Sequence, residues 1–305
     1  MLQNYNPKNK DLLVYINGNL VHRDKAGVNP FDSSVQNGDA CWEGLRLYKG
    51  KIFKLEEHLD RLFKSAEMLR YQGLPSKEEI IIALRQTLTA NNMIDNVHVR
   101  LTISRGLKYT SGLDPRINTQ GCSLFILAEH KAPVYGRDGL HLVTVKQRRP
   151  FADVLDQRIH SCNQLTSILA KLEANDAGAD DALMLDTAGY LAETNATHVF
   201  LVKDETVLTS TTKACPTGIT RDTVLRLCEE NNITYRIEDL SEKEIHEADE
   251  VFCTGTMGEI VAVRQIDDTI YNNSQPENMT NHLAELFAEL TRTSGYPIID
   301  ISAKS

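Results

Sequence analysis

The sequence predicts an α+β protein made of two domains, and three observations support this class. The chain has 305 residues, which is long for one hydrophobic core. Its first part reads as hairpins and helices, whereas strands and helices are mixed after residue 140. The sequence contains neither a GxGxxG motif nor a Walker loop, so a nucleotide-binding, doubly wound sheet is disfavoured.

The N-terminal domain begins with two predicted hairpins. Asn17–Gly18 separates two apolar runs, which is a strong signal for a two-residue turn, and a second hairpin is expected about Lys49–Gly50. A helix with an apolar stripe follows over residues 55–69. A second helix opens at Ser76, where Glu79 completes a capping box.

Residues 97–104 alternate as a strand does. One face carries apolar residues, which are Val97, Val99, Leu101 and Ile103. The other face carries polar residues, which are His98, Arg100, Thr102 and Ser104. Two interpretations stay open: this polar face is exposed to water, or it lines a pocket.

The domain boundary is expected where Pro133, Gly136 and Gly139 lie close together. We therefore predict a small α+β domain over residues 1–132, a linker over 133–139 and a large domain over 140–305. The large domain is expected to contain strands at 140–146, 182–186, 198–203, 206–210, 234–238 and 250–255, and helices at 164–177, 221–232, from Ser241 with Glu244 as its capping box, and 279–292.

Composition excludes several classes of function. The net charge of −9 and the lack of a Lys/Arg cluster argue against nucleic-acid binding. No apolar run approaches the roughly 20 residues of a membrane span, and the first ten residues do not resemble a signal peptide. Six scattered cysteines without a CxxC pattern indicate free thiols in the cytoplasm, and no zinc-type spacing is present.

The stretch DQRIHSCN, residues 156–163, places His160 and Cys162 two positions apart just before a helix. A thiol–imidazole dyad would need a third orienting group and an oxyanion hole, and neither is visible nearby. A metal site would need further spaced ligands. Both interpretations are disfavoured, and the function of the stretch has to be inferred from the rest of the chain.

Four other segments suggest a site for an anion. PTGITRDTV, from residue 216, places a glycine at a helix start, where free amides bind phosphate. CTGTMGEI, from residue 253, ends a strand in small and hydroxyl residues. Glu193 precedes a strand, and a helix flank carries His58, Arg61 and Ser65. Each segment by itself also fits an ordinary structural role.

Taken together and in this order, these segments resemble the fold-type IV pyridoxal-phosphate enzymes. That family includes branched-chain aminotransferases, D-amino-acid aminotransferases and aminodeoxychorismate lyases. The resemblance covers nearly the whole chain, through WEGLRLYKGKIFKLEEHLDRL, LAKLEANDAGADDALMLD, GYLAETNATHVF, PTGITRDTV and ADEVFCTGTMGEI. It implies a two-domain fold-type IV architecture that binds pyridoxal or pyridoxamine 5′-phosphate.

The resemblance also implies roles for individual residues. Arg61, the amides of Ile219 and Thr220, and Thr256 match contacts to the cofactor phosphate, and Glu193 matches the carboxylate that faces the pyridine nitrogen. The substrate side is expected to include Trp42, His98, Arg100 and Met257. His98 replaces a usual tyrosine and Trp42 a common phenylalanine, which leaves the substrate preference open.

His160 occupies the position of the lysine that binds the cofactor covalently in this family. Imidazole can carry a proton, but it cannot form that link. We therefore expect a non-covalent cofactor with His160 as the proton carrier, unless Lys108 or Lys213 substitutes for the missing lysine. Lys171, which lies well inside a predicted helix, is expected to be structural.

The leading hypothesis is a cytoplasmic, homodimeric aminotransferase-like enzyme that acts on an amino acid and a 2-oxo acid. Branched-chain substrates are one option, and no metal is expected. Two alternatives stay open: a cofactor-binding homologue that has lost transamination, and a lyase of the aminodeoxychorismate lyase type.

Overall fold

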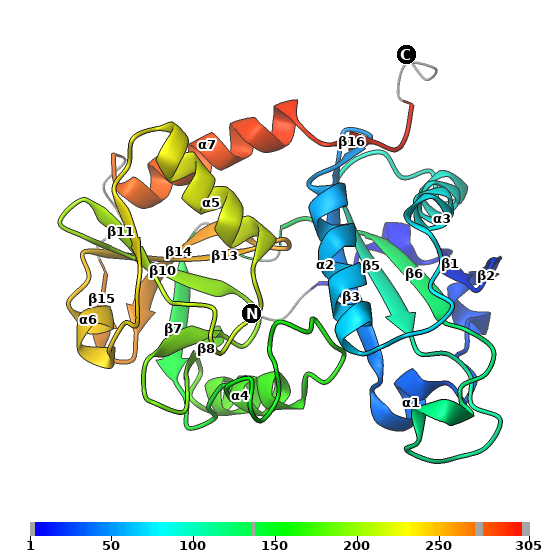
Figure 1. Ribbon diagram of the computed structural model, residues 1–305. Helices are drawn as coiled ribbons and strands as arrows, with labels where there is room; N and C mark the ends of the chain where they lie inside the picture. The colour runs from blue at the N-terminus through cyan, green and yellow to red at the C-terminus, as the bar shows by residue number, and fades with distance from the viewer. Residues whose placement is uncertain (1–3, 134, 136–137, 272–276, 301–305) are drawn as a thin grey trace. The chain divides into compact units, whose positions relative to one another are not determined.

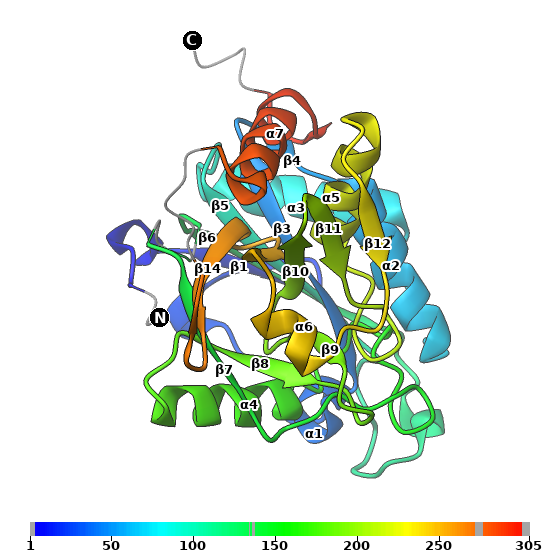
Figure 2. The same cartoon turned by 90° about the vertical axis from the view of Figure 1, so that its left-hand side faces the viewer.

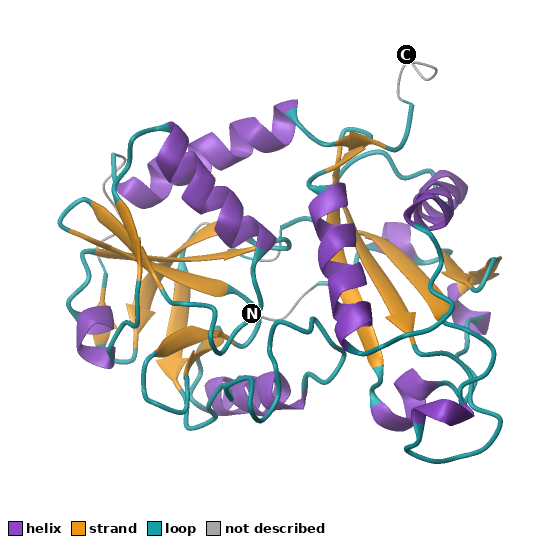
Figure 3. Cartoon of the chain, in the orientation of Figure 1, coloured by secondary structure: helices purple, strands orange, loops and turns teal. Residues whose placement is uncertain are grey.

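The computed structural model describes residues 4–133, 135, 138–271 and 277–300. These residues form two compact units, each built on one sheet (Figures 1 and 3). Of these residues, the first unit comprises 4–132, 159–163 and 291–300, and the second comprises 133, 135, 138–158, 164–271 and 277–290. The short segment 159–163 and the C-terminal segment thus lie with the N-terminal unit, whereas the sequence had suggested a domain 140–305. As domain boundaries, 132 and 140 stay a prediction, and positions 134, 136 and 137 of the expected linker lie outside the described residues.

The N-terminal unit contains a seven-stranded sheet in the order β16-β4-β3-β5-β6-β1-β2. Its strands are β1 (Leu13–Ile16), β2 (Asn19–His22), β3 (Ala40–Tyr48), β4 (Lys51–Ile52), β5 (Val97–Ser104), β6 (Ser123–His130) and β16 (Tyr296–Pro297). Its helices are α1 (Ser33–Asn37), α2 (Leu55–Met68) and α3 (Lys77–Ala90), with short 3-10 turns at Pro7–Asn9, Arg23–Lys25 and Pro115–Ile117. Every strand pairing in this sheet is antiparallel.

Both predicted hairpin turns of this unit are confirmed, and so is the predicted start of α3. Asn17–Gly18 joins β1 to β2 with positive φ at both residues, which is the backbone conformation that asparagine and glycine tolerate best. Lys49–Gly50 joins β3 to β4 in the same way. The helix α3 begins with the full capping box of Ser76 and Glu79.

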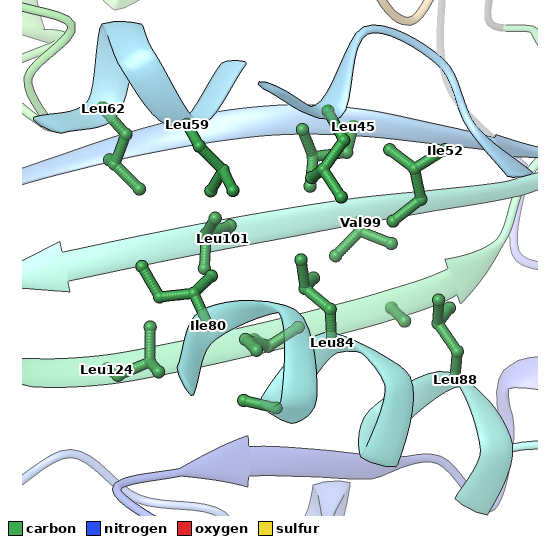
Figure 4. Packing of buried hydrophobic residues seen from close by; sticks show 14 of the residues in the cluster. Leu45, Ile52, Leu59, Leu62, Ile80, Leu84, Leu88, Val99, Leu101 and Leu124 are labelled. Carbon is green, nitrogen blue, oxygen red and sulfur yellow. The ribbon is translucent and has the colours of Figure 1, made fainter. Parts of the chain in front are cut away.

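The core of the N-terminal unit lies between α2, α3 and one face of the sheet (Figure 4). Leu59 and Leu62 of α2 and Leu84 of α3 pack against Val99 and Leu101 of β5. The predicted alternation of β5 is therefore confirmed, because its odd-numbered residues face this core and its even-numbered ones face away. The strands β3 and β5 consequently present a second, polar face that the helices do not cover.

The second unit contains a nine-stranded sheet in the order β12-β11-β10-β13-β14-β7-β8-β9, with β15 paired to β14. Its strands are β7 (Leu140–Thr144), β8 (Asp181–Leu185), β9 (Leu191–Thr194), β10 (His198–Lys203), β11 (Thr206–Thr209), β12 (Tyr235–Ile237), β13 (Glu250–Gly255), β14 (Glu259–Ile266) and β15 (Thr269–Ile270). Its helices are α4 (Leu165–Asp176), α5 (Ile219–Glu230), α6 (Glu242–His246) and most of α7 (Met279–Thr293). The predicted capping box at Ser241 and Glu244 is present at the start of α6.

Small residues let α4 lie close to the sheet. Ala170 and Ala174 of this helix pack against Ala182 and Met184 of β8, and Figure 2 shows α4 running beside β7 and β8.

Within the described residues, no helix is both long and apolar enough to cross a membrane.

Candidate active site

Glu43 is the centre of a buried polar cluster in the N-terminal unit. It lies on the core side of β3, and its carboxylate is fully shielded from solvent. Arg61 of α2 donates from Nε to Oε1 at 2.8 Å and from Nη2 to Oε2 at 2.7 Å. His58 of the same helix lies with Nδ1 2.6 Å from Oε2. Arg61, the residue expected to bind the cofactor phosphate, is thus held by a carboxylate that the sequence analysis did not identify.

The charge of Arg61 decides the ionisation of this carboxylate. Burial alone would raise the pKa of Glu43, but the nearby Arg61 charge, the His160 ring and the hydrogen bond from His58 hold it well below its usual value. Glu43 is therefore ionised at neutral pH, and the cluster keeps a carboxylate inside an otherwise apolar layer.

His160 lies beside the start of β3, within the same unit. The segment 159–163 adds to the sheet edge there, because Trp42 donates its amide to the His160 carbonyl at 3.0 Å and Cys162 donates to Ala40 at 2.8 Å. The His160 amide donates to Ser65 Oγ at 3.0 Å. The helix flank of His58, Arg61 and Ser65 therefore contacts both Glu43 and the histidine segment.

The imidazole of His160 is held by three contacts. Its ring stacks on Trp42 with centroids 4.4 Å apart. Its Nδ1 lies 2.5 Å from the Trp42 carbonyl oxygen and 3.5 Å from Glu43 Oε1. Burial and the Arg61 charge lower the pKa of His160, although Glu43 and the Trp42 carbonyl oppose this shift. Since both neighbours of Nδ1 are acceptors, Nδ1 carries the proton of the neutral ring and Nε2 is the basic nitrogen.

Three of the four expected substrate residues, Trp42, His98 and Arg100, share the polar face of β3 and β5. The Arg100 guanidinium lies 3.6 Å from the centre of the Trp42 ring, which also stacks with the His160 ring. The ring of His98 lies over Gly44, where an added Cβ would come within 3.3 Å of Nε2. His98 Nε2 is buried and has no hydrogen-bond partner among the described residues.

Several positive charges surround His98. Burial, followed by the charges of Lys131, Arg46 and Arg100, lowers the pKa of His98 to about 3. The ring is therefore neutral at physiological pH. This face thus combines a neutral imidazole with guanidinium groups, and it suits a ligand that carries a carboxylate.

Each lysine that could replace the missing one has other partners. Lys108 is buried and donates to Asn37 and to the carbonyl of Gly112. Lys213 pairs with Asp239 at 2.8 Å on the surface of the second unit. Lys171 binds Asp181 and the Asp180 carbonyl, in agreement with a structural role.

Glu193 is buried in the second unit, on β9, and has a cationic partner. Arg149 Nε lies 3.1 Å from Glu193 Oε1, and both side chains are almost fully shielded from solvent. His198 Nδ1 lies 3.9 Å from the other carboxylate oxygen. Arg149 itself donates to Ser167 of α4 and to the Thr194 carbonyl. Arg149 is a second residue that the sequence analysis missed.

Ile219 and Thr220 are the first two residues of α5, as the resemblance implied. Gly218 is the N-cap, and no side chain within the described residues caps this start. A Cβ at Gly218 would lie 2.3 Å or less from the His198 ring, so glycine is required by close packing. The amides at this helix start are therefore available to an anion.

A buried hydroxyl lies on the same face as His198. Thr254 pairs with His198 across β13 and β10, which places both side chains on one side of the sheet. Its Oγ1 is buried and has no hydrogen-bond partner among the described residues. Thr256 and Met257, which were expected to contact phosphate and substrate, lie half-buried in the turn between β13 and β14.

The candidate residues thus form one set in each unit. Arg61, His160, Trp42, His98 and Arg100 lie in the N-terminal unit, and Glu193, Ile219, Thr220, Thr256 and Met257 lie in the second. Glu43 could have been found from its position, since a carboxylate between Cys41 and Leu45 interrupts the apolar face of a strand. Arg149 carries no comparable local signal, because its partner is distant in sequence.

Known proteins share this architecture. The family model described as amino-transferase class IV matches residues 40–266, and the chain therefore belongs to this family. It is 48% identical over 293 residues to branched-chain-amino-acid aminotransferase-like protein 2 of Arabidopsis thaliana, covering 96% of this chain and 52% of that protein. The chain thus spans about half the length of this relative, and the same holds for protein 1 of that plant, of which it covers 53%.

Other relatives match along their whole length. A putative branched-chain-amino-acid aminotransferase of Methanocaldococcus jannaschii is 38% identical, covering 94% of this chain and 99% of that protein. Among solved structures, a T.th. branched-chain amino acid aminotransferase with pyridoxamine 5′-phosphate has a TM-score of 0.86 and 29% identity, covering 93% and 96% of the two chains. The same enzyme complexed with N-(5′-phosphopyridoxyl)-L-glutamate has a TM-score of 0.85 and 30% identity, covering 93% and 95%. The fold-type IV architecture is therefore confirmed.

Proposed function

We propose that this protein is an aminotransferase that binds pyridoxal or pyridoxamine 5′-phosphate and transfers an amino group between an amino acid and a 2-oxo acid. The names of the relatives make branched-chain substrates the first to test. The similar T.th. enzyme has been solved with pyridoxamine 5′-phosphate and with N-(5′-phosphopyridoxyl)-L-glutamate, which supports the choice of cofactor.

The observation that carries this proposal is the uncapped start of α5. Its amides at Ile219 and Thr220 are suited to a phosphate, and the unpartnered hydroxyl of Thr254 lies on the sheet face against which Gly218 packs. Both features need an acceptor that the described residues do not supply. A phosphate monoester fits them, with Arg61 and Thr256 as the further contacts that the family resemblance assigns.

When bound, pyridoxal phosphate supplies an electron sink for a carbanion at the substrate α-carbon. Glu193 is assigned to hold a proton on the ring nitrogen, and Arg149, with Nε 3.1 Å from Glu193 Oε1, supplies a positive charge beside this carboxylate. His160 is neutral and offers Nε2 as a base, while Nδ1 stays bonded to the Trp42 carbonyl. Arg100 and His98 are assigned to the substrate carboxylate and its surroundings.

We also propose that the cofactor is held without a covalent bond. Histidine in the lysine position supports this, and so do the partners that occupy Lys108 and Lys213. The cofactor would then be retained through its phosphate, its ring nitrogen and the surrounding side chains. A homologue that binds the cofactor without transamination is the competing interpretation, because His160 has a shorter reach than lysine.

Spectroscopy of the protein loaded with pyridoxamine phosphate separates these two interpretations. Addition of a branched-chain 2-oxo acid should convert the pyridoxamine absorbance to that of the pyridoxal form, with formation of the matching amino acid. Stable cofactor binding without any spectral change would contradict transamination and favour the binding homologue. Production of pyruvate and an aromatic amine from aminodeoxychorismate would instead favour the lyase.

We propose a homodimer on the basis of α4. The helix turns Ser167, Ala170 and Ala174 toward the unit, but it exposes a stripe of large apolar residues, namely Leu165, Ile168, Leu169 and Leu172, each 39% to 66% exposed. Val154 and Leu155, in the loop that precedes this helix, are also exposed. An ordinary surface helix turns its large apolar residues toward the core, whereas this helix turns them outward. A partner subunit related by a two-fold axis would cover them. The six free cysteines support a cytoplasmic location.

A further inference from the structure

Glu43 contacts both Arg61 and His160. The proposed function assigns Arg61 to the cofactor phosphate and His160 to proton transfer. Glu43 Oε1 accepts from Arg61 and lies 3.5 Å from His160 Nδ1. Its Oε2 accepts a second bond from Arg61 and lies 2.6 Å from His58 Nδ1. The three partners come from α2 and from the segment 159–163, so one carboxylate joins two parts of the chain that are about a hundred residues apart in sequence.

A purely stabilising role explains this arrangement poorly. A buried ion pair gains little over a well-packed apolar pair, because both charges must leave water. Glu43 lies on a strand face where its neighbours Cys41 and Leu45 belong to the apolar core. An apolar residue would fill this position at lower cost, whereas the carboxylate imposes direction and charge on Arg61 and on His160.

Glu43 acts on Arg61 through geometry. Two parallel hydrogen bonds fix the plane of the guanidinium, in the fork arrangement that carboxylates favour. Arg61 thus cannot swing without breaking both bonds. A phosphate-binding arginine that is held in this way loses little side-chain entropy when its ligand arrives.

Glu43 acts on His160 through charge and tautomer. Its Oε1 and the Trp42 carbonyl are the two acceptors beside Nδ1, and the positive charge of Arg61 opposes protonation of the same ring. Ser65 binds the His160 backbone, and the Trp42 ring contacts both the His160 ring and the Arg100 guanidinium. The carboxylate is therefore the one anionic neighbour among these groups, and it offsets the Arg61 charge.

We propose that Glu43 is a positioning residue for the proposed aminotransferase reaction. Its carboxylate holds the Arg61 guanidinium in place for the cofactor phosphate, and it keeps Nδ1 of His160 protonated so that Nε2 exchanges the proton. This inference rests on the proposed function for the roles of Arg61 and His160, but the contacts themselves can be tested without any cofactor.

The first test is ¹⁵N NMR of the histidine side chains in the cofactor-free protein, with the His160 signals identified by their loss in His160→Ala. Wild-type His160 should show the neutral tautomer protonated at Nδ1. In Glu43→Gln the pKa of His160 should fall by about 1, which lowers its protonated fraction about tenfold at a given acidic pH. Glu67→Gln removes the same charge from the exposed side of α2 and should leave the titration unchanged.

The second test is titration of the cofactor-free variants with pyridoxamine 5′-phosphate and with pyridoxamine. Glu43→Gln should weaken binding of the phosphate ester roughly tenfold and should leave binding of the phosphate-free amine nearly unchanged. Glu43→Asp keeps the charge one methylene further away, and it should fall between wild type and Glu43→Gln in both tests.

Failure of this inference can be separated from failure of the proposed function. Wild-type protein that binds no pyridoxamine phosphate would contradict the function, while the NMR result would still decide the contact with His160. An Nε2-protonated His160 in the wild type, or an unchanged His160 titration in folded Glu43→Gln, would overturn the inference. If Glu43→Gln does not fold, the wild-type tautomer and Glu43→Asp provide the decision.

Discussion

Arg149 and Glu193 form an ion pair of 3.1 Å that is almost fully withdrawn from solvent, although 44 positions separate them in the sequence. The removal of one partner would leave the other charge buried and uncompensated. We therefore expect Arg149→Met to lower the free energy of unfolding of the protein by about 3–5 kcal/mol. Urea denaturation followed by circular dichroism measures this loss.

The control for this prediction is the neighbouring residue. Arg148 is exposed, and among the described residues it donates to the Val145 carbonyl alone. Arg148→Met should therefore cost less than about 1 kcal/mol, as surface changes usually do. Equal losses for the two variants would show that the Arg149–Glu193 pair makes no specific contribution to stability.

Replacement of His160 tests the proposed proton carrier. His160→Ala should leave the affinity for pyridoxamine phosphate nearly intact, because the proposed phosphate contacts do not include it, and should lower the transamination rate about 10²–10⁴-fold. Borohydride treatment of the wild type with pyridoxal phosphate should leave no label at position 160, whereas His160→Lys should acquire one there. Full activity of His160→Ala, or a wild-type label on Lys108 or Lys213, would assign the proton transfer to another group.

We expect the lowered pKa of His98 to make the free energy of unfolding depend on pH. Its pKa is lowered from 6.5 to about 3 in the folded state, so the unfolded chain binds more protons between these two values. This contribution to stability is fully present above pH 6.5 and is lost as the pH falls toward 3, by about 1.4 kcal/mol per pH unit at most. His98→Gln should flatten that part of the stability curve, measured by urea unfolding at successive pH values.

The half-buried His22 on the edge strand β2 serves as the comparison. His22→Gln should follow the wild-type curve through the same pH range. If His98→Gln leaves the slope of stability against pH unchanged, other groups cause the acid sensitivity, and the carboxylate of Glu43 is the next to test.

The exposed stripe of α4 predicts the assembly state. Charges at Ile168 and Leu172 would be solvated in a monomer but buried against a partner in a dimer, where they are strongly unfavourable. The double variant Ile168→Glu/Leu172→Glu should therefore sediment as a monomer at micromolar concentration, while the wild type sediments as a dimer. Ile82→Glu on α3, at a residue that is 50% exposed, is the matched control and should stay dimeric.

Gly218 tests the start of α5. A methyl group there would overlap the His198 ring, so Gly218→Ala should displace the helix start and lower stability by about 1–3 kcal/mol. The affinity for pyridoxamine phosphate should fall more than that for pyridoxamine. Gly27→Ala, which meets no atom within 4 Å, should change neither quantity. Unaltered phosphate ester binding in Gly218→Ala would remove this helix start from the candidate site.

Local chemistry made much of the fold predictable. The turns at Asn17–Gly18 and Lys49–Gly50 depend on residues that tolerate positive φ, and the capping box of Ser76 and Glu79 joins groups three positions apart. The alternation of residues 97–104 follows from the two-residue repeat of a strand. Signals of this kind act within a few residues, and they can therefore be read directly from the order of the chain.

The sequence by itself also identified His160 as the unusual residue, and through the family resemblance it supplied Arg61, Glu193 and the start of α5. Only the tertiary structure showed that Arg61 is held by Glu43, that Glu193 is paired with Arg149, and that His160 stacks on Trp42. These contacts join residues 18 to 118 positions apart. Their formation depends on how strands and helices pack, because a buried charged group can pair only with a residue that the fold brings close to it.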